Sequence, residues 1–132
     1  MAEEGPRSQA RERALALLYE AEMRGVDPTE VLAGLVAAPD PYAVELVEGV
    51  SAQLAVIDDL IAAASVDWDL DRMATVDRQV LRLATFELLG ELDVPLAVVI
   101  DEAVELAKQF STEESGGFVN GVLSTVARQV RP

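Results

Sequence analysis

Residues 97–127 read AVVIDEAVELAKQFSTEESGGFVNGVLSTVA, and this stretch decides the fold class. Apolar residues recur every three or four positions on both sides of a polar segment at residues 111–117. This spacing is typical of amphipathic helices, in which one stripe of side chains faces a core. We therefore predict two helices, over about residues 95–110 and 117–129, joined by a polar turn.

The helical spacing continues toward the N-terminus. Pro6 and Ser8 open a helix over about residues 6–23, and Gly25 stands where a helix ends. Asp27-Pro28 and Asp40-Pro41 each combine an N-cap residue with a proline in the first turn. They predict a short helix to about residue 36 and a longer one to about residue 64. In the longer helix Gly49 is a weak point, and the expected inward residues are Val44, Val47, Leu54, Ile57 and Ile61.

Residues 65–73, SVDWDLDRM, alternate acidic and apolar residues. Alternation suits a strand, but the chain offers no second strand for pairing, so we expect a 3-10 turn held by Trp68 and Leu70. Thr75 then caps a helix over residues 75–89, with a polar stripe at Thr75, Arg78, Arg82 and Thr85. About seven helical segments with short connections predict an all-α fold. We expect one domain, residues 1–132, made of two small helical subdomains over about 1–66 and 67–132.

Composition excludes several kinds of chemistry. The chain has 132 residues, of which 51% are hydrophobic, and it contains no cysteine and no histidine. Disulfides, zinc fingers, cysteine nucleophiles and histidine bases are therefore absent. Asp67, Asp69 and Asp71 resemble the start of a calcium loop, but arginine occupies the sixth and twelfth loop positions. We expect a cytoplasmic binding protein, neither an enzyme nor a membrane protein, with no metal and no cofactor.

The net charge of −14 argues against nonspecific binding to nucleic acid. Much of the acidity lies in residues 26–71, which contain ten acidic residues and no basic one. A solvated surface is the favoured interpretation of this segment, and an acidic docking face is the alternative. Residues 1–25 carry four arginines and five acids, so a local basic strip can exist there.

The first helix contains the best candidates for RNA contacts. Arg7 and Arg11 lie four residues apart on one helix face, and Arg13 lies on a flanking face. Guanidinium groups at this spacing can reach successive phosphates, and Tyr19 can stack on a base. From spacing alone, an ordinary solvated helix with Tyr19 in the core is favoured. Phe118 is more simply a core residue too, whereas Asn120 must satisfy backbone groups or contact a ligand.

Three segments resemble the NusB transcription antitermination family. They are the stretch quoted above with its FVNGVL block, ARERALALLYEAE at residues 10–22, and VDRQVLRLATFELL at residues 76–89. The resemblance covers nearly the whole chain in order. It implies an all-helical fold of two subdomains and binding to boxA, a single-stranded element of ribosomal RNA leader transcripts. It also implies partnership with NusE, a ribosomal small-subunit protein, within an RNA polymerase elongation complex that holds other Nus factors.

The resemblance also assigns residues to each partner. RNA contacts are expected at Arg7, Arg11, Arg13, Tyr19, Lys108, Gln109, Phe118 and Asn120. The partner side is expected to involve Asp77, with Arg78 beside it, and Glu114. This chain departs from the family where Ser8 and Gln9 interrupt a run of adjacent arginines. Fewer phosphate contacts predict weaker RNA binding, which leads to the hypothesis that NusE supplies much of the positive surface.

Alternatives remain open at this stage. A helical protein–protein adaptor with weak or lost RNA binding fits the acidic charge. A domain like those that precede some ribosomal RNA methyltransferases fits less well, because residues 1–132 contain no methyl-donor site. The family includes monomers and homodimers, and the sequence does not choose between them. A dimer that covers the first helix would hide Arg7 and Arg11 from RNA.

Overall fold

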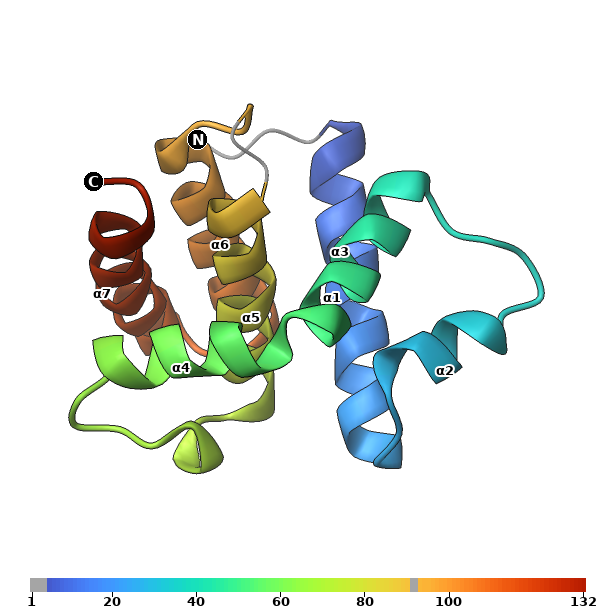
Figure 1. Cartoon of the computed structure of the whole chain (residues 1–132), viewed down its shortest axis with the longest axis horizontal. Coiled ribbons are helices and arrows are strands. Elements are labelled where there is room, and N and C mark those ends of the chain that lie inside the picture. The colour runs from blue at the N-terminus through green and yellow to red at the C-terminus, as the bar shows by residue number, and fades with distance from the viewer. Residues whose placement is uncertain (1–4, 91–92) are drawn as a thin grey trace.

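The computed structural model describes residues 5–90 and 93–132 and is all-α over these residues. Figure 1 shows α1 and α3 side by side with α2 at one end of the molecule, α5, α6 and α7 grouped at the other, and α4 lying across the second group. The helices are α1 Pro6–Arg24, α2 Pro28–Ala33, α3 Pro41–Ala52, α4 Leu54–Ala64, the 3-10 turn η1 Leu70–Arg72, α5 Thr75–Gly90, α6 Leu96–Phe110 and α7 Glu113–Val130. None of these helices is long and apolar enough to span a membrane.

In the N-terminal half the predicted helix starts at residues 6, 28 and 41 and the predicted end of α1 are confirmed, whereas α2 ends at Ala33 and not near residue 36. The side chains of Asp27 and Asp40 accept hydrogen bonds from the backbone N–H of Thr29, at 2.9 Å, and of Tyr42, at 2.8 Å. These bonds satisfy N–H groups that have no partner within the helix. Gly25 ends α1 with φ 69°, a left-handed conformation that glycine adopts without a steric cost. The 3-10 turn after residue 65 is also confirmed, but Trp68 is 52% exposed and does not anchor it.

The predicted long third helix is two helices. Gln53, with φ −112° and ψ 22°, separates α3 from α4. The physical reason is that α3 packs on α1 and α5 whereas α4 packs on α5 and α7, and one straight helix cannot follow both directions. Ile57 and Ile61 are buried as predicted, whereas Leu54, the first residue of α4, is 37% exposed instead of inward.

Gly49 has a packing role that the sequence did not reveal. A Cβ added there would lie 2.1 Å from Cζ of Phe86, a buried ring on α5. The absence of a side chain therefore lets the α3 backbone lie directly against the ring. Since α3 stays helical through Gly49, the glycine serves close contact between α3 and α5 and is not the point where the helix ends.

The last helix starts four residues earlier than predicted. Thr112 caps α7: its hydroxyl accepts a 3.1 Å hydrogen bond from the N–H of Ser115, and the Ser115 hydroxyl accepts a 3.4 Å bond from the N–H of Thr112. This capping box turns most of the predicted polar turn into the first turn of α7. Gly116 is explained by packing, because a Cβ there would lie 2.9 Å from the Lys108 side chain of α6.

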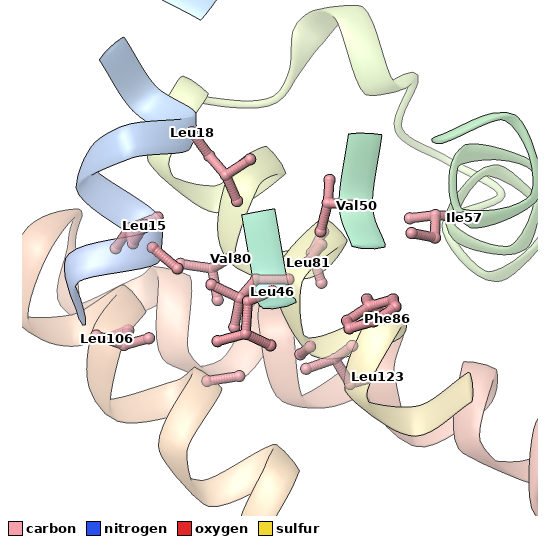
Figure 2. Close-up of a cluster of buried hydrophobic side chains, with 14 of the residues drawn as sticks. Leu15, Leu18, Leu46, Val50, Ile57, Val80, Leu81, Phe86, Leu106 and Leu123 are labelled. Carbon is pink, nitrogen blue, oxygen red and sulfur yellow. The ribbon is translucent and has the colours of Figure 1, made fainter. Parts of the chain in front are cut away.

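One continuous core joins the two groups of helices. Figure 2 shows Leu15, Leu46, Ile57, Leu81 and Leu123 converging from α1, α3, α4, α5 and α7. α5 lies between the groups, and even Thr85 of its predicted polar stripe is fully buried. The division into subdomains near residue 66 stays a prediction. The packing of α4 on α5 and α7 favours a division at Gln53 instead.

Candidate nucleic-acid interface

Arg11 does not lie on the surface expected for it. Its side chain is 4% exposed and is enclosed between α1, α5 and α6. The Nε–H group of Arg11 donates to both carboxylate oxygens of Glu87, at 2.9 and 3.0 Å, and its Nη1 donates to Oε1 of Glu102, at 2.9 Å. The expectation that Arg7 and Arg11 share an exposed face is corrected, because these two buried carboxylates hold the Arg11 guanidinium inside the protein.

Two hydroxyl groups complete what we call the Arg11 cluster, which consists of Ser8, Arg11, Tyr42, Glu87 and Glu102. The hydroxyl of Tyr42 donates to Glu87, and that of Ser8 donates to Glu102. Burial, reinforced by the bond to Glu87, raises the pKa of Tyr42 far above its usual value of 10.0, so the phenol stays protonated. The cluster ties α1, α3, α5 and α6 together and is a structural centre.

Arg7 lies at the outer edge of this cluster. Its guanidinium carbon is 4.6 Å from the centre of the Tyr42 ring, and Nη2 is 3.4 Å from Asp93. The side chain remains 47% exposed, so it can also reach a ligand. Arg13 is exposed on another side of α1, as its predicted flanking position requires.

Tyr19 lies on an apolar groove instead of in the core. It is 41% exposed, and beside it on α6 is Phe110, which is 43% exposed. The cavity between these rings has a volume of about 380 Å³ and is lined by Glu12, Leu15, Ala16, Tyr19, Val76 and Phe110. We call this cavity the Tyr19 groove. Sequence reasoning missed Phe110; the available signal was an aromatic residue at the very end of a helix, where solvent is near.

Asp77 and Phe118 share a second cavity. Its volume is about 360 Å³, and we call it the Asp77 hollow. The lining residues are Trp68, Arg72, Ala74, Asp77, Ser111, Thr112, Glu114, Ser115 and Phe118. The sequence assigned Phe118 to RNA but Asp77 and Glu114 to a protein partner. The structure brings these residues into one place, so the two predicted surfaces adjoin.

The Tyr19 groove and the Asp77 hollow are neighbours. Val76 and Phe110 line the Tyr19 groove. The residues that follow them in the sequence, Asp77 and Ser111, line the Asp77 hollow. Consecutive residues at the start of α5 and at the end of α6 thus form the ridge between the two cavities. Four of the six aromatic residues of the chain, Tyr19, Trp68, Phe110 and Phe118, line this pair of cavities. We call these four side chains the aromatic track.

Arg78 was expected to contact the protein partner, but its guanidinium group forms hydrogen bonds within the chain. It donates to Glu22 and to the carbonyl oxygens of Leu70, at 2.7 Å, and Met73, at 2.9 Å. Its side chain is 12% exposed. This expectation is corrected, because the guanidinium fastens η1 to α5 and has little surface to offer. Glu114 is exposed on the rim of the Asp77 hollow.

The remaining predicted RNA residues do not gather on one face. Lys108 and Gln109 are both exposed on α6 but diverge by about 100° around the helix. The Lys108 stem lies over Gly116, and Asn120 is exposed one turn further along α7. Phe118 is half-buried on the opposite flank of α7, facing the Asp77 hollow. Asn120 and Phe118 therefore cannot contact one base together.

Four of the ten basic side chains are held inside the fold. Of the ten basic residues, Arg11, Arg78 and Arg82 form ion pairs inside the fold, and Arg131 donates to the carbonyl oxygens of Glu87, Leu88 and Val94. Within the described ranges no group of acidic side chains is arranged to hold a metal ion. The site offers aromatic surfaces and hydrogen-bonding groups, with few charges.

The fold and site define a helical binding protein whose most distinctive surface is aromatic. Comparison with known proteins gives the family. The NusB family model matches residues 8–128. The chain is 54% identical over 124 residues to the transcription antitermination protein NusB of Acidothermus cellulolyticus, covering 91% of this chain and 86% of the relative. It is 52% identical over 128 residues to that of Salinispora tropica, covering 92% and 94%. This chain belongs to the NusB family.

Solved structures agree with this assignment. Thermotoga maritima NusB superimposes with a TM-score of 0.86 at 41% identity, covering all of this chain and 96% of that one. A chain from a structure of the antitermination factors NusB and NusE in complex with double-stranded RNA gives 0.79 at 31% identity, covering 93% and 96%. NusB of Aquifex aeolicus gives 0.77 at 32% identity, covering 92% and 87%. The all-α fold of NusB type is thus confirmed.

Proposed function

We propose that this protein is a transcription antitermination factor that binds single-stranded boxA RNA of ribosomal RNA leader transcripts together with NusE. The observation that carries the proposal is the aromatic track. Exposed rings cost free energy in water, and base stacking on such rings stabilises single-stranded nucleic acid complexes by about 1–3 kcal/mol per base. The two adjoining cavities provide room for successive bases, and a structurally similar NusB occurs with NusE and double-stranded RNA.

The distribution of charge defines the role of the partner. Arg11 is buried, and Ser8 and Gln9 are uncharged, so the first helix offers Arg7 and Arg13 to phosphates. Each lost phosphate contact lowers the salt dependence of single-strand binding by about 0.7 on a log–log plot. NusE supplies the missing positive surface in this proposal. The rim of the Asp77 hollow at Glu114 is where NusE and RNA lie next to each other, within an elongation complex that includes RNA polymerase and other Nus factors.

The test is a titration of fluorescently labelled boxA RNA with this protein, with and without NusE. We expect much tighter binding in the presence of NusE and a shallow salt dependence without it. A scrambled RNA of equal length serves as the control for sequence selectivity. Equal affinity with and without NusE would contradict the role given to the partner, and no binding in either case would contradict the RNA-binding function.

A second candidate function is a protein–protein adaptor with lost RNA binding, which the internal use of Arg11, Arg78 and Arg82 favours. Substitution Tyr19→Ala separates the two. Under the RNA-binding proposal it weakens RNA affinity and leaves the affinity for NusE alone unchanged. Under the adaptor proposal RNA affinity is negligible before and after the substitution. The choice between monomer and homodimer stays a prediction to be settled by light scattering over a dilution series.

A further inference from the structure

The first turns of α1 and α6 enclose a cavity of about 470 Å³, which we call the Arg7 cavity. In Figure 1 both helices begin at the upper edge of the molecule. Arg7 is an exposed cation on the wall of this cavity, whereas Asp93, Asp101 and Glu102 contribute three carboxylates. Acidic side chains therefore surround a guanidinium group that the first helix offers to phosphate.

Asp93 binds Arg7 directly. Nη2 of Arg7 donates to Oδ2 of Asp93 at 3.4 Å, and the guanidinium carbon lies 4.6 Å from the centre of the Tyr42 ring. The side chains of Arg7 and Asp93 are 47% and 67% exposed, so RNA can reach both of them. A phosphate that binds Arg7 must displace the Asp93 carboxylate or share the guanidinium group with it, and either arrangement weakens binding.

The backbone next to Asp93 is anchored to the fold. Val94 is 2% exposed, and its carbonyl oxygen accepts a 2.8 Å hydrogen bond from Arg131. Arg131 also donates to two carbonyl oxygens in the last turn of α5, and Pro95 precedes the first residue of α6. Holding the Asp93 carboxylate near the guanidinium group therefore requires little further ordering of the chain.

We propose that Asp93 limits the affinity of this protein for RNA by competing with a phosphate for Arg7. This inference rests on the RNA-binding function proposed above. A carboxylate and a phosphate accept hydrogen bonds from the same N–H groups of a guanidinium, so binding of one disfavours binding of the other. An exposed ion pair is weak and is screened by salt, so the competition is strongest at low ionic strength.

The first experiment is a titration of labelled boxA RNA with the full chain and NusE at low salt. Asp93→Asn removes the negative charge and keeps the size of the side chain. We expect this variant to bind RNA about two- to fivefold more tightly than the wild type, the range of an exposed ion pair, and the gain to shrink at high salt. Asp101→Asn is the matched control, because it removes an exposed carboxylate from the wall of the same cavity.

A double-mutant cycle then assigns the gain to Arg7. In an Arg7→Ala background there is no guanidinium group to release, so adding Asp93→Asn should change RNA affinity no more than Asp101→Asn does. Arg7→Ala by itself should weaken binding, because a phosphate contact is lost. Thermal unfolding and the affinity for NusE alone check that the variants are folded and that the partner surface is unchanged.

Each outcome decides the proposal. A gain in Asp93→Asn that exceeds the gain in Asp101→Asn and disappears in the Arg7→Ala background supports it. Equal gains in the two aspartate variants would show general repulsion between the cavity and RNA and would overturn it. A gain that persists without Arg7, or unchanged or weaker binding of Asp93→Asn, also overturns it and leaves the proposed function intact. No RNA binding by the wild-type protein with NusE overturns the inference and the proposed function together.

Discussion

The Arg11 cluster and the Asp77 hollow are both polar sites at helix junctions, and they differ in how completely their hydrogen bonds are satisfied. In the Arg11 cluster both carboxylates have donors, and the arginine binds both of them. In the Asp77 hollow, which Trp68 and Phe118 also line, one buried carboxylate oxygen has no donor among residues 5–90 and 93–132. A satisfied buried network holds the fold together, whereas a buried polar atom without a partner costs free energy.

The burial of Arg11 also shows that an arginine on an amphipathic helix need not face solvent. The side chains of Arg11, Glu87 and Glu102 are at most 6% exposed, and the positive charge of Arg11 is paired with the two carboxylates. The candidate interface is built mainly from aromatic groups elsewhere.

The largest expected effect is on stability in the Arg11 cluster. Arg11→Ala leaves Glu87 and Glu102 buried without their cation, which costs about 3–5 kcal/mol in the free energy of unfolding. Urea denaturation measures this loss. Arg13→Ala, a change at an exposed site on the same helix, should shift stability by no more than about 0.5 kcal/mol. An Arg11→Ala variant with wild-type stability but reduced RNA affinity would reverse the comparison and restore Arg11 as an RNA ligand.

A smaller loss is expected where α3 meets α5, next to the cluster that joins them. Gly49→Ala places a methyl group against the buried Phe86 ring and should destabilise the protein by about 1–3 kcal/mol through overpacking. Gly117→Ala is the matched control, because open space surrounds that exposed helical glycine and alanine is favoured there by about 1 kcal/mol. Thermal unfolding should move in opposite directions for the two variants, and a shift in the same direction would refute the packing argument.

Substitutions in the aromatic track should weaken RNA binding and change the free energy of unfolding very little. Phe110→Ala removes one stacking surface and should weaken RNA binding in the presence of NusE by about 1–3 kcal/mol, which is about 5-fold to 150-fold in affinity. Val66→Ala, at an apolar residue that is 88% exposed and outside both cavities, serves as the control. Fluorescence anisotropy gives the affinities. If both variants bind RNA like the wild-type protein, stacking on α6 is not part of the interface.

The smallest expected effect is the dependence on pH of the stability that Glu22 contributes. Burial alone would raise the pKa of Glu22, but hydrogen bonds from Arg78 and Gln79 outweigh it and hold the pKa below 4.5. A lowered folded-state pKa means that this carboxylate stabilises the fold above about pH 4.5 and that its contribution is lost as the pH falls through the folded-state value. The difference in urea midpoint between wild type and Glu22→Gln should therefore shrink on acidification, and a constant difference would contradict the assignment.

Much of the fold was predictable because its signals are local. N-caps at Asp27 and Asp40, the terminating Gly25 and the apolar spacing of α1, α5 and α6 depend on residues within one or two turns. The break at Gln53 was not predictable, since it depends on which distant helices α3 and α4 contact. The early start of α7 had a local signal, the Thr112–Ser115 capping box, that was not recognised.

The candidate site was predictable only in part. Tyr19 and Phe118 were named from the family resemblance, and the structure places both on cavities. Phe110 and Trp68 were not named, because nothing local shows that two ends of helices meet there. Asp77 and Phe118 are separated by 41 positions in the sequence, and only packing of α5 against α7 brings them into one hollow.

The sequence by itself determined the all-helical class, most helix ends and membership of the NusB family, because periodicity, capping residues and motif blocks are written along the chain. Only the tertiary structure decided which charged and aromatic groups are available. Arg11 and Asp77 are both charged residues on amphipathic helices, and nothing in their local sequence separates them. The partners that reach them from other helices do: Glu87 and Glu102 pair with Arg11, whereas Asp77 receives a hydrogen bond from Ser115 on only one of its two oxygens among the described residues.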